Sequence, residues 1–224
     1  ALLYGQDSAA RLRAAVASIN AEHVDAGFVV LTGDMTHWGD AAAYARFKYE
    51  IKKLKMPAHL MVGNHDDTAA FGEAFPEIPR DENGFVQSGF DTPFGRFLLL
   101  DTKDPKTHAG AYCLARQAWL DRELDQPAGP LLPFMHHPPF KTGIASMDRI
   151  MLHDAEKFYE VIAPHKPRIR HLFFGHVHRA IFGNWRGMSY SCMRGLNHQV
   201  VLEMDGPADR IAGNFEPPAY GVVT

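Results

Sequence analysis

The most informative segment of this chain for its fold is Ala58-His59-Leu60-Met61-Val62-Gly63-Asn64-His65-Asp66. Its first five residues are mostly apolar, which is typical of a short strand buried on both faces of a sheet. The strand then runs straight into glycine and three polar residues, and glycine allows the backbone to turn tightly at that point. Read alone, an amide, an imidazole and a carboxylate at one strand end only mildly favour a functional site.

The same change from an apolar strand to polar side chains occurs three more times, at Gly33-Asp34, at His136-His137-Pro138-Pro139 and at Gly175-His176-Val177-His178. Taken singly, the first is most often a turn, the second favours a strand end before a proline-rich loop, and the third is balanced between structure and function. Chance is a poor explanation for the same change after four separate strands. In α/β folds the carboxyl ends of strands face one crevice where ligands bind, so we expect these polar residues to meet there.

Helical segments alternate with the apolar strands. We expect helices over residues 8–23, 41–54, 68–75, 115–124 and 154–163, and strands over 27–32, 58–62, 84–90, 97–100, 131–135 and 169–174. Antiparallel strands are expected between residues 180 and 204. The alternation predicts the α/β class, and the antiparallel end predicts mixed sheets. Because neither an internal repeat nor a linker interrupts the pattern, we expect one domain over residues 1–224.

The composition argues against several classes of protein. The chain has 224 residues, 46% of them hydrophobic, and a formal net charge of −3, which is ordinary for a globular chain and unlike a disordered one. The near-neutral charge argues against binding a nucleic-acid polymer through bulk positive charge. No apolar run approaches the roughly 20 residues that span a bilayer, and no signal peptide is evident, so we expect a cytoplasmic protein without membrane contact. Cys113 and Cys192 are predicted to be buried, reduced thiols.

The residue types at the strand ends are those that bind divalent transition metals. The carboxylate of Asp34 has two oxygens and can bridge two ions, Asn64 offers a carbonyl oxygen, and His136 offers a ring nitrogen. In a strand, residues two apart point to one face, so His176 and His178 are expected to reach adjacent metals while the residue between them faces the core. The sequence therefore predicts a polynuclear metal site.

This set of motifs resembles the motif series of the calcineurin-like metallophosphoesterases, over residues 3 to about 204. The segments Gly63-Asn64-His65-Asp66 and Met135-His136-His137-Pro138-Pro139 are most similar to the branch of class III cyclic nucleotide phosphodiesterases and glycerophosphodiesterases. The resemblance implies a calcineurin-like four-layer α/β/β/α sandwich with two mixed sheets. It also implies hydrolysis of a phosphodiester, either a cyclic nucleotide or a glycerophosphodiester, by a hydroxide activated by two divalent metal ions (Mn, Fe, Zn or Co).

The resemblance further implies a role for each ligand-type residue. Asp34 would bridge the two metals, Asn64, His136 and His176 would complete the second metal site, and His178 would belong to the first. The family's first strand carries an Asp-x-His motif, whereas this sequence starts at Ala1-Leu2-Leu3-Tyr4-Gly5, just after that position. We expect further residues upstream; the alternative is a first metal site that has lost two ligands.

Residues beside the ligands are candidates for the chemistry. His65 is not a ligand in the family, and it is placed to protonate the leaving oxygen or to stabilise the transferring phosphoryl group. Asp66 either orients the His65 imidazole or caps the helix that follows. Substrate contacts are expected from Asn64 and from His108, which lies in the loop after residue 101.

Other functions remain open at this stage. One is a phosphomonoesterase or nucleotide pyrophosphatase on the same fold, since function depends on pocket loops rather than on the fold. Another is a degenerate, metal-poor binding module, which the absent Asp-x-His supports and the retained motifs oppose. The expected partner is a small phosphate ester, and the resemblance makes a homo-oligomer plausible. For His37, Trp38 and His198 a structural or surface role is the more typical interpretation, and lining the substrate pocket is the alternative.

Overall fold

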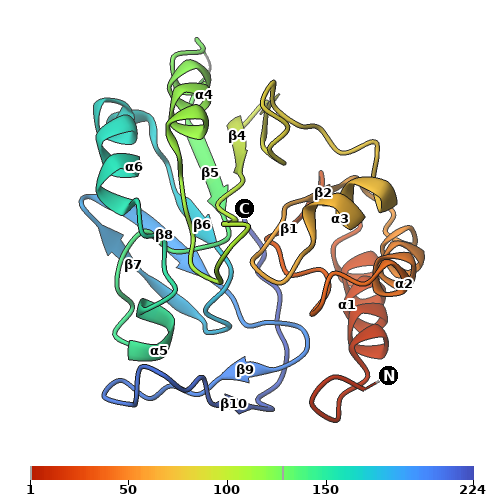
Figure 1. Ribbon diagram of the computed structural model, residues 1–224. Coiled ribbons are helices and arrows are strands. Elements are labelled where there is room, and N and C mark those ends of the chain that lie inside the picture. The colour runs from red at the N-terminus through yellow and green to blue at the C-terminus, as the bar shows by residue number, and fades with distance from the viewer. Residues whose placement is uncertain (1, 128) are drawn as a thin grey trace.

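The computed structural model describes residues 2–127 and 129–224 (Figure 1). Its elements follow one another in the alternating order that the sequence predicts. They are α1 (Ser8–Glu22), β1 (Val29–Leu31), α2 (Ala41–Ile51), β2 (Ala58–Leu60), α3 (Thr68–Ala74), β3 (Ser88–Thr92), β4 (Gly95–Leu100), α4 (Leu114–Leu124), β5 (Leu131–Met135), α5 (Ala145–Asp148), α6 (Ala155–Ile162), the 3-10 helix η1 (Ala163–Arg168), β6 (Leu172–Phe174), β7 (Ile181–Trp185), β8 (Met188–Cys192), β9 (Gln199–Val200) and β10 (Gly213–Asn214).

The strands form one large sheet and two small pairs. The large sheet has six strands in the order β3-β4-β5-β6-β8-β7; its central pairs are parallel, and the hairpins β3-β4 and β7-β8 at its edges are antiparallel. β1 and β2 pair in parallel because α2 carries the chain back between them, and β9 pairs with β10 antiparallel. The α/β class is therefore confirmed. The expectation that both main sheets are mixed is wrong, because β1-β2 is a purely parallel pair.

Three apolar clusters show the order of the layers (Figure 1). The first packs α4 and α6 on one face of the six-stranded sheet, through residues such as Leu98 and Leu100 of β4. The second lies on the opposite face and includes Phe97 and Leu99, which alternate with the first two and pack toward β1 and β2. The third joins β1 and β2 to α1, α2 and α3. The order is helix, sheet, sheet, helix, which agrees with the four layers expected.

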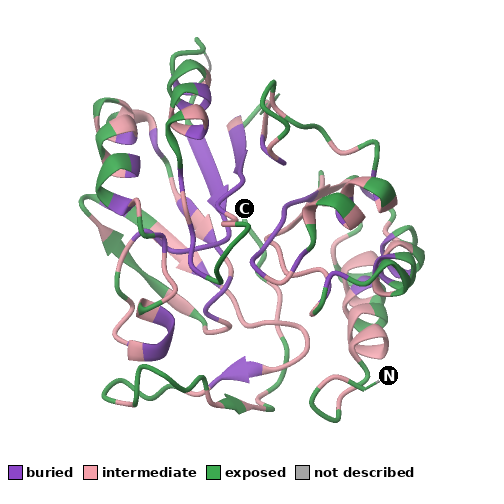
Figure 2. Ribbon diagram, in the orientation of Figure 1, coloured by how far each residue is buried: buried purple, intermediate pink, exposed green. Residues whose placement is uncertain are grey.

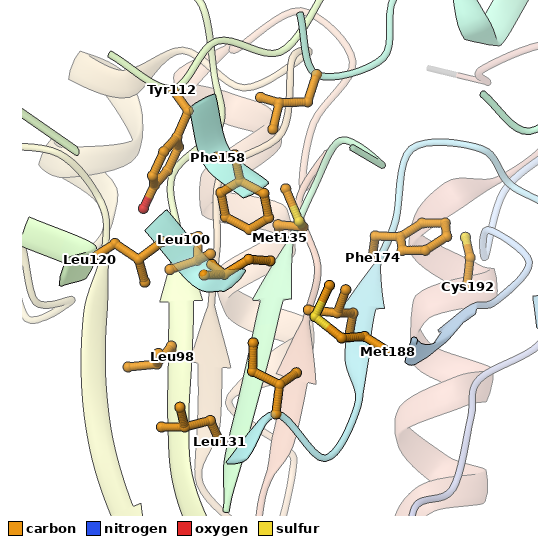
Figure 3. Packing of buried hydrophobic residues seen from close by; sticks show 14 of the residues in the cluster. Leu98, Leu100, Tyr112, Leu120, Leu131, Met135, Phe158, Phe174, Met188 and Cys192 are labelled. Carbon is orange, nitrogen blue, oxygen red and sulfur yellow. The ribbon is translucent and has the colours of Figure 1, made fainter. Parts of the chain in front are cut away.

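The largest of these clusters is a conventional side-chain core. Figure 2 shows buried residues concentrated on β4, β5 and the inward sides of α4 and α6. Figure 3 shows Leu120, Phe158 and Met135 packed together from a helix, a second helix and a strand. This packing stabilises the carboxyl ends of the central strands from behind, so that the loops leaving them start from rigid positions.

Several local expectations differ from the structure. The predicted 154–163 helix ends as α6 at Ile162 and continues as the 3-10 helix η1, which contains Pro164 and Pro167. Proline lacks the N–H that an α-helix needs, so the change in helix type follows from these residues. The short helix α5 was not expected. The strand predicted over 84–90 lies at Ser88–Thr92, because the turn at Gly84, whose φ is +84°, delays it.

The two cysteines are in different environments. Cys192 is buried, as predicted, but Cys113 is exposed. The prediction for Cys113 is wrong because the residue is the N-cap of α4, where the chain lies at the surface. Both cysteines are free thiols. None of the helices within residues 2–127 and 129–224 combines the length and the apolar character needed to cross a bilayer.

Candidate metal centre

Four side chains from four strand ends meet where the two main sheets converge. Asp34 follows β1, Asn64 follows β2, His136 follows β5 and His176 follows β6. The Oδ1 atom of Asn64 lies 2.9 Å from Nδ1 of His176 and 3.1 Å from Nε2 of His136. Nε2 of His136 in turn lies 3.3 Å from Nδ1 of His176 and 3.3 Å from Oδ2 of Asp34. The four atoms therefore form one compact cluster.

The chemistry of these atoms fits a cation. Nδ1 of His136 lies 2.7 Å from the carbonyl oxygen of Thr32, which can only accept, so Nδ1 carries the hydrogen and Nε2 of the neutral ring presents a lone pair. That lone pair faces the carbonyl oxygen of Asn64 and the carboxylate of Asp34. These acceptor atoms repel one another unless a positive charge lies among them. Ligand atoms around a tetrahedral metal with bonds of about 2.1 Å lie roughly 3.4 Å apart, close to the spacings found here.

One ring nitrogen of His176 is left without a hydrogen bond in the described chain. Its Nε2 atom is buried and has no hydrogen-bond partner among residues 2–127 and 129–224. The side that does make contacts is Nδ1, which faces the cluster. An imidazole whose only polar neighbours are other acceptor atoms is suited to donating its lone pair to a metal.

Charge and burial favour the metal-binding protonation state at Asp34 and His176 but oppose it at His136. Burial would raise the pKa of Asp34, but the imidazoles of His136 and His65 outweigh it and hold that pKa well below its usual range. Burial, followed by the neighbouring histidines, lowers the pKa of His176 well below its ordinary value. Burial opposes a cation at His136 as well, yet the charge of Asp34 raises its pKa. Metal binding competes with this proton, since a ligand histidine must be neutral.

The backbone is strained at the same residues. Only five non-glycine residues in the described chain have positive φ, and three of them are Asp34 (56°), His176 (65°) and His178 (52°). This left-handed region is costly for a residue with a Cβ atom and is found mainly where surrounding structure enforces it, often at functional sites. The strain redirects these side chains at the strand ends.

Glycines make the close approach possible. A Cβ atom at Gly63 would overlap Oδ1 of Asp34 and lie 2.5 Å from its backbone nitrogen. A Cβ atom at Gly33 would lie 2.5 Å from Nδ1 of His136. Gly33 and Gly63 therefore leave the space that Asp34 and His136 occupy, in addition to allowing the backbone to turn tightly.

His137 is close to the cluster but is not available to a metal. One of its ring nitrogens lies within 4.8 Å of ligand-type atoms of His136 and His176. However, Nε2 of His137 donates to the carbonyl oxygen of His108 (3.1 Å), and Nδ1 accepts from Oγ1 of Thr102 (2.8 Å). Both nitrogens are already used, and burial lowers the pKa of His137 well below its ordinary value. His137 is a neutral, structural histidine.

His178 lies beside the cluster rather than in it. Its Nδ1 atom lies 3.0 Å from the carbonyl oxygen of His198, so Nδ1 donates there and Nε2 is left with a free lone pair. Burial, followed by His198, lowers its pKa to about 4, against the charge of Asp34. Strand alternation was the wrong reason for pairing His178 with His176, because both residues follow β6 with positive φ. Val177 does face the core, as expected, with no exposed surface.

His65 is held firmly beside the cluster. Its backbone N–H donates to Oδ1 of Asp34 (2.9 Å), and its Nδ1 lies 3.1 Å from the carbonyl oxygen of His37. Its ring stacks on the His37 ring with centroids 4.6 Å apart, and the ring of His108 lies at 5.1 Å on a tilted plane. Because Nδ1 donates to a carbonyl, Nε2 is the atom free to act on a substrate.

Asp66 serves neither of the roles considered for it. Its carboxylate accepts from the backbone N–H groups of Gly63, Met35 and Thr36 and from the hydroxyl of Tyr44. The N-cap of α3 is Asp67. Asp66 therefore ties the loop after β1 to the loop after β2, and the His65 ring is oriented by His37.

Aromatic side chains line one rim of the cluster. Tyr4 contacts the rings of His37 and His198, with centroids 5.5 Å and 4.8 Å away, and Trp38 contacts His37 at 4.2 Å. Trp38 is 75% exposed and Tyr4 is 55% exposed. We call Tyr4, His37, Trp38 and His198 the aromatic rim. A purely structural role for His37 and His198 does not predict this grouping. No sequence pattern around Tyr4 indicates it either, because the neighbours of Tyr4 come from distant segments.

Comparison with known proteins identifies a family for this chain. Residues 5–180 match the family model described as calcineurin-like phosphoesterase. A probable cyclic nucleotide phosphodiesterase of Rhodopseudomonas palustris is 45% identical over 227 residues, covering 99% of this chain and 82% of that protein. The 3',5'-cyclic adenosine monophosphate phosphodiesterase CpdA of Pseudomonas aeruginosa is 30% identical over 189 residues, covering 84% of this chain and 66% of that protein.

The fold comparison points the same way. A dimetal phosphatase of Danio rerio superposes with a TM-score of 0.68 at 17% identity, over 84% of this chain and 78% of that one. At that identity the likeness concerns the fold alone. From its motifs, its layers and its match over most of its length, the chain belongs to the calcineurin-like metallophosphoesterase family, whose members bind divalent metals.

Proposed function

We propose that residues 1–224 form a single metallophosphoesterase domain that hydrolyses a phosphodiester with the help of two divalent metal ions. Asp34, Asn64, His136 and His176 would hold one ion, and Asp34 with His178 would contribute ligands to the other. The observation that carries the proposal is the convergence of acceptor atoms from Asn64, His136 and Asp34 at 3.1–3.3 Å, with their lone pairs facing one another.

The ligand set narrows the choice of metal without fixing it. Carboxylate, amide and imidazole together suit Mn, Fe, Co or Zn. When bound, ions of this kind lower the pKa of water toward neutrality and neutralise charge on a phosphate group. The two oxygens of Asp34 point in different directions, one toward His136 and the other toward the backbone N–H of His65, which supports a bridging role.

His65 supplies the proton transfer in this proposal. Its Nδ1 hydrogen is directed to the carbonyl oxygen of His37, so a proton carried on Nε2 can pass to the oxygen of the leaving group. Stacking on His37 fixes the plane of the ring. The chain thus orients one proton donor beside the position where phosphate would bind.

A nucleotide suits the aromatic rim better than a glycerol ester does. The aromatic rim offers exposed, planar side chains at Tyr4 and Trp38, and every nucleobase has a π-face that stacks on such groups. A glycerol moiety would gain little from them. The names of the relatives from Rhodopseudomonas palustris and Pseudomonas aeruginosa also favour a cyclic nucleotide.

The test is hydrolysis by the purified chain loaded with Mn²⁺ or Co²⁺. We expect faster turnover of bis-p-nitrophenyl phosphate than of p-nitrophenyl phosphate, and turnover of 3',5'-cyclic AMP above that of glycerophosphocholine. Preference for the monoester would instead support a phosphomonoesterase. Absence of both bound metal and turnover would support the binding-module alternative. We also predict a homo-oligomer. Light scattering on the same sample measures the oligomeric state.

A further inference from the structure

The loop from residue 103 to residue 110 holds Asn64 at two points. Nζ of Lys103 donates to the backbone carbonyl oxygen of Asn64 (3.2 Å), and Nδ2 of the Asn64 amide lies 2.9 Å from Nδ1 of His108. One contact fixes the main chain and the other fixes the side chain. We call residues 103–110 the clamp loop.

The second contact determines which end of the Asn64 amide faces the cluster. An amide has an oxygen that accepts and a nitrogen that donates, and the two are nearly the same size. The oxygen lies toward His136 and His176, at 3.1 Å and 2.9 Å, where only an acceptor can bind a cation. If the amide were rotated by half a turn, its N–H groups would point at the cluster and the site would lose one ligand.

The clamp loop is itself held in place by hydrogen bonds to buried residues. Nε2 of His137 donates to the carbonyl oxygen of His108 (3.1 Å), and Thr102 donates to Nδ1 of His137 (2.8 Å). Lys103 and Gly110 form a β-bridge that closes the loop at its base. His137 has no exposed surface, so this support is part of the core. The exposed His108 is thereby held at a defined distance from Asn64.

We infer that His108 is a positioning residue that sets metal affinity by holding the Asn64 amide with its oxygen inward. This inference rests on the metal site of the proposed function, and it replaces direct substrate contact as the first role of His108. Residues that orient a metal ligand typically change metal affinity by about 10–100-fold when they are removed.

The test measures Co²⁺ binding directly, by calorimetric titration and by the visible absorption of the bound ion, without any turnover. His108→Phe keeps a planar ring beside His65 but removes the acceptor for the Asn64 amide. We expect the site that contains Asn64 to bind Co²⁺ about 10–100-fold more weakly in this variant. Lys106→Gln, a change in the same loop at an exposed residue, is the matched control and should bind Co²⁺ as the unmodified chain does.

The same His108→Phe substitution in an Asn64→Asp variant distinguishes loss of amide positioning from general damage to the loop. In Asn64→Asp both terminal atoms are oxygens, so no orientation has to be selected. We expect His108→Phe to change Co²⁺ affinity less than about twofold in that background, although it weakens binding in the parent chain. Unchanged affinity of His108→Phe in the parent chain would overturn the inference, as would an equal loss in both backgrounds. If no variant binds Co²⁺, including the parent, it is the proposed metal site that fails.

Discussion

Oδ1 of Asp34 accepts the backbone N–H of His65 at 2.9 Å, while Oδ2 of the same carboxylate lies 3.3 Å from Nε2 of His136. One side chain therefore connects the ends of β1, β2 and β5, which belong to two different sheets. Because both oxygens are engaged, a change at Asp34 alters the relative placement of the proposed proton donor and the proposed metal ligands together.

Asp34→Ala removes the only carboxylate of the cluster. We expect the bound metal to fall at both positions, since a bridging carboxylate is shared between them. Elemental analysis of the purified protein after incubation with Mn²⁺ measures the content. A metal content equal to that of the unmodified chain would show that Asp34 does not bridge.

His65→Ala should separate chemistry from metal binding. The side chain of His65 is not among the cluster atoms, so metal content should stay unchanged, while kcat should fall by about 10²–10⁴-fold because general acid catalysis is lost. The comparison is made on the diester substrate that the protein turns over best. His153→Ala, at an exposed histidine whose Nε2 bonds to the carbonyl of Arg149, is the control. An unchanged rate for His65→Ala would refute the role.

Gly63→Ala should disturb the site by steric overlap. The added methyl group would meet both the carboxylate and, at 2.5 Å, the backbone nitrogen of Asp34, and the backbone there cannot move aside easily. We expect weaker metal binding and a loss of roughly 1–3 kcal/mol in the free energy of unfolding, measured with urea.

Gly27→Ala is the matched control for this substitution, since a Cβ at Gly27 meets nothing within 4 Å. It should leave metal binding unchanged and keep stability within about 1 kcal/mol. Equal behaviour of the two variants would show that close packing at Gly63 does not matter.

Glu50 predicts a pH dependence of stability away from the site. Its carboxylate is completely buried and pairs with Arg13 at 2.9 Å and Lys53 at 2.6 Å. The hydrogen bonds from Arg13 and then Lys53 lower its pKa from 4.5 to about 2. A carboxyl with a lowered folded-state pKa stabilises the protein above its ordinary pKa, and this contribution disappears as the pH falls through the folded value.

The measurement is the difference in Tm between the parent chain and Glu50→Gln as a function of pH. The variant should be less stable at pH 7, and the difference should shrink between pH 4.5 and about 2 as Glu50 becomes protonated in the parent. A difference that stays constant across that range would show that the ion pairs do not contribute through the charge of Glu50.

Much of the arrangement could be read from local sequence. Apolar runs ending in Gly33-Asp34 and Gly63-Asn64 identify strands whose next residues leave the sheet, and the positions after β1, β2, β5 and β6 follow from that alone. The exposure of Cys113 and the bonding of Asp66 could not be predicted. They depend on which segments pack nearby, and nothing within a few residues encodes it.

The side chains of His176 and His178 are not oriented by strand alternation. Alternation along a strand predicts that side chains two apart share a face, but both residues follow β6 with positive φ. The approach of Asp34 and Asn64 from the other sheet lies outside any window of sequence around residue 176. A period of two describes regular backbone only, so it fails where the chain leaves the sheet.

Local sequence sets which side chains follow the strands, and thereby the class of ligands, because strand formation and glycine turns are governed by neighbouring residues. Long-range packing, in contrast, selects which nitrogen of each histidine is free and which end of the Asn64 amide faces inward. Those choices are made by hydrogen-bond partners such as Thr32, His108 and His198, which come from distant parts of the chain. Donor and acceptor pairing acts only over contact distance, so it is fixed when the two sheets pack together.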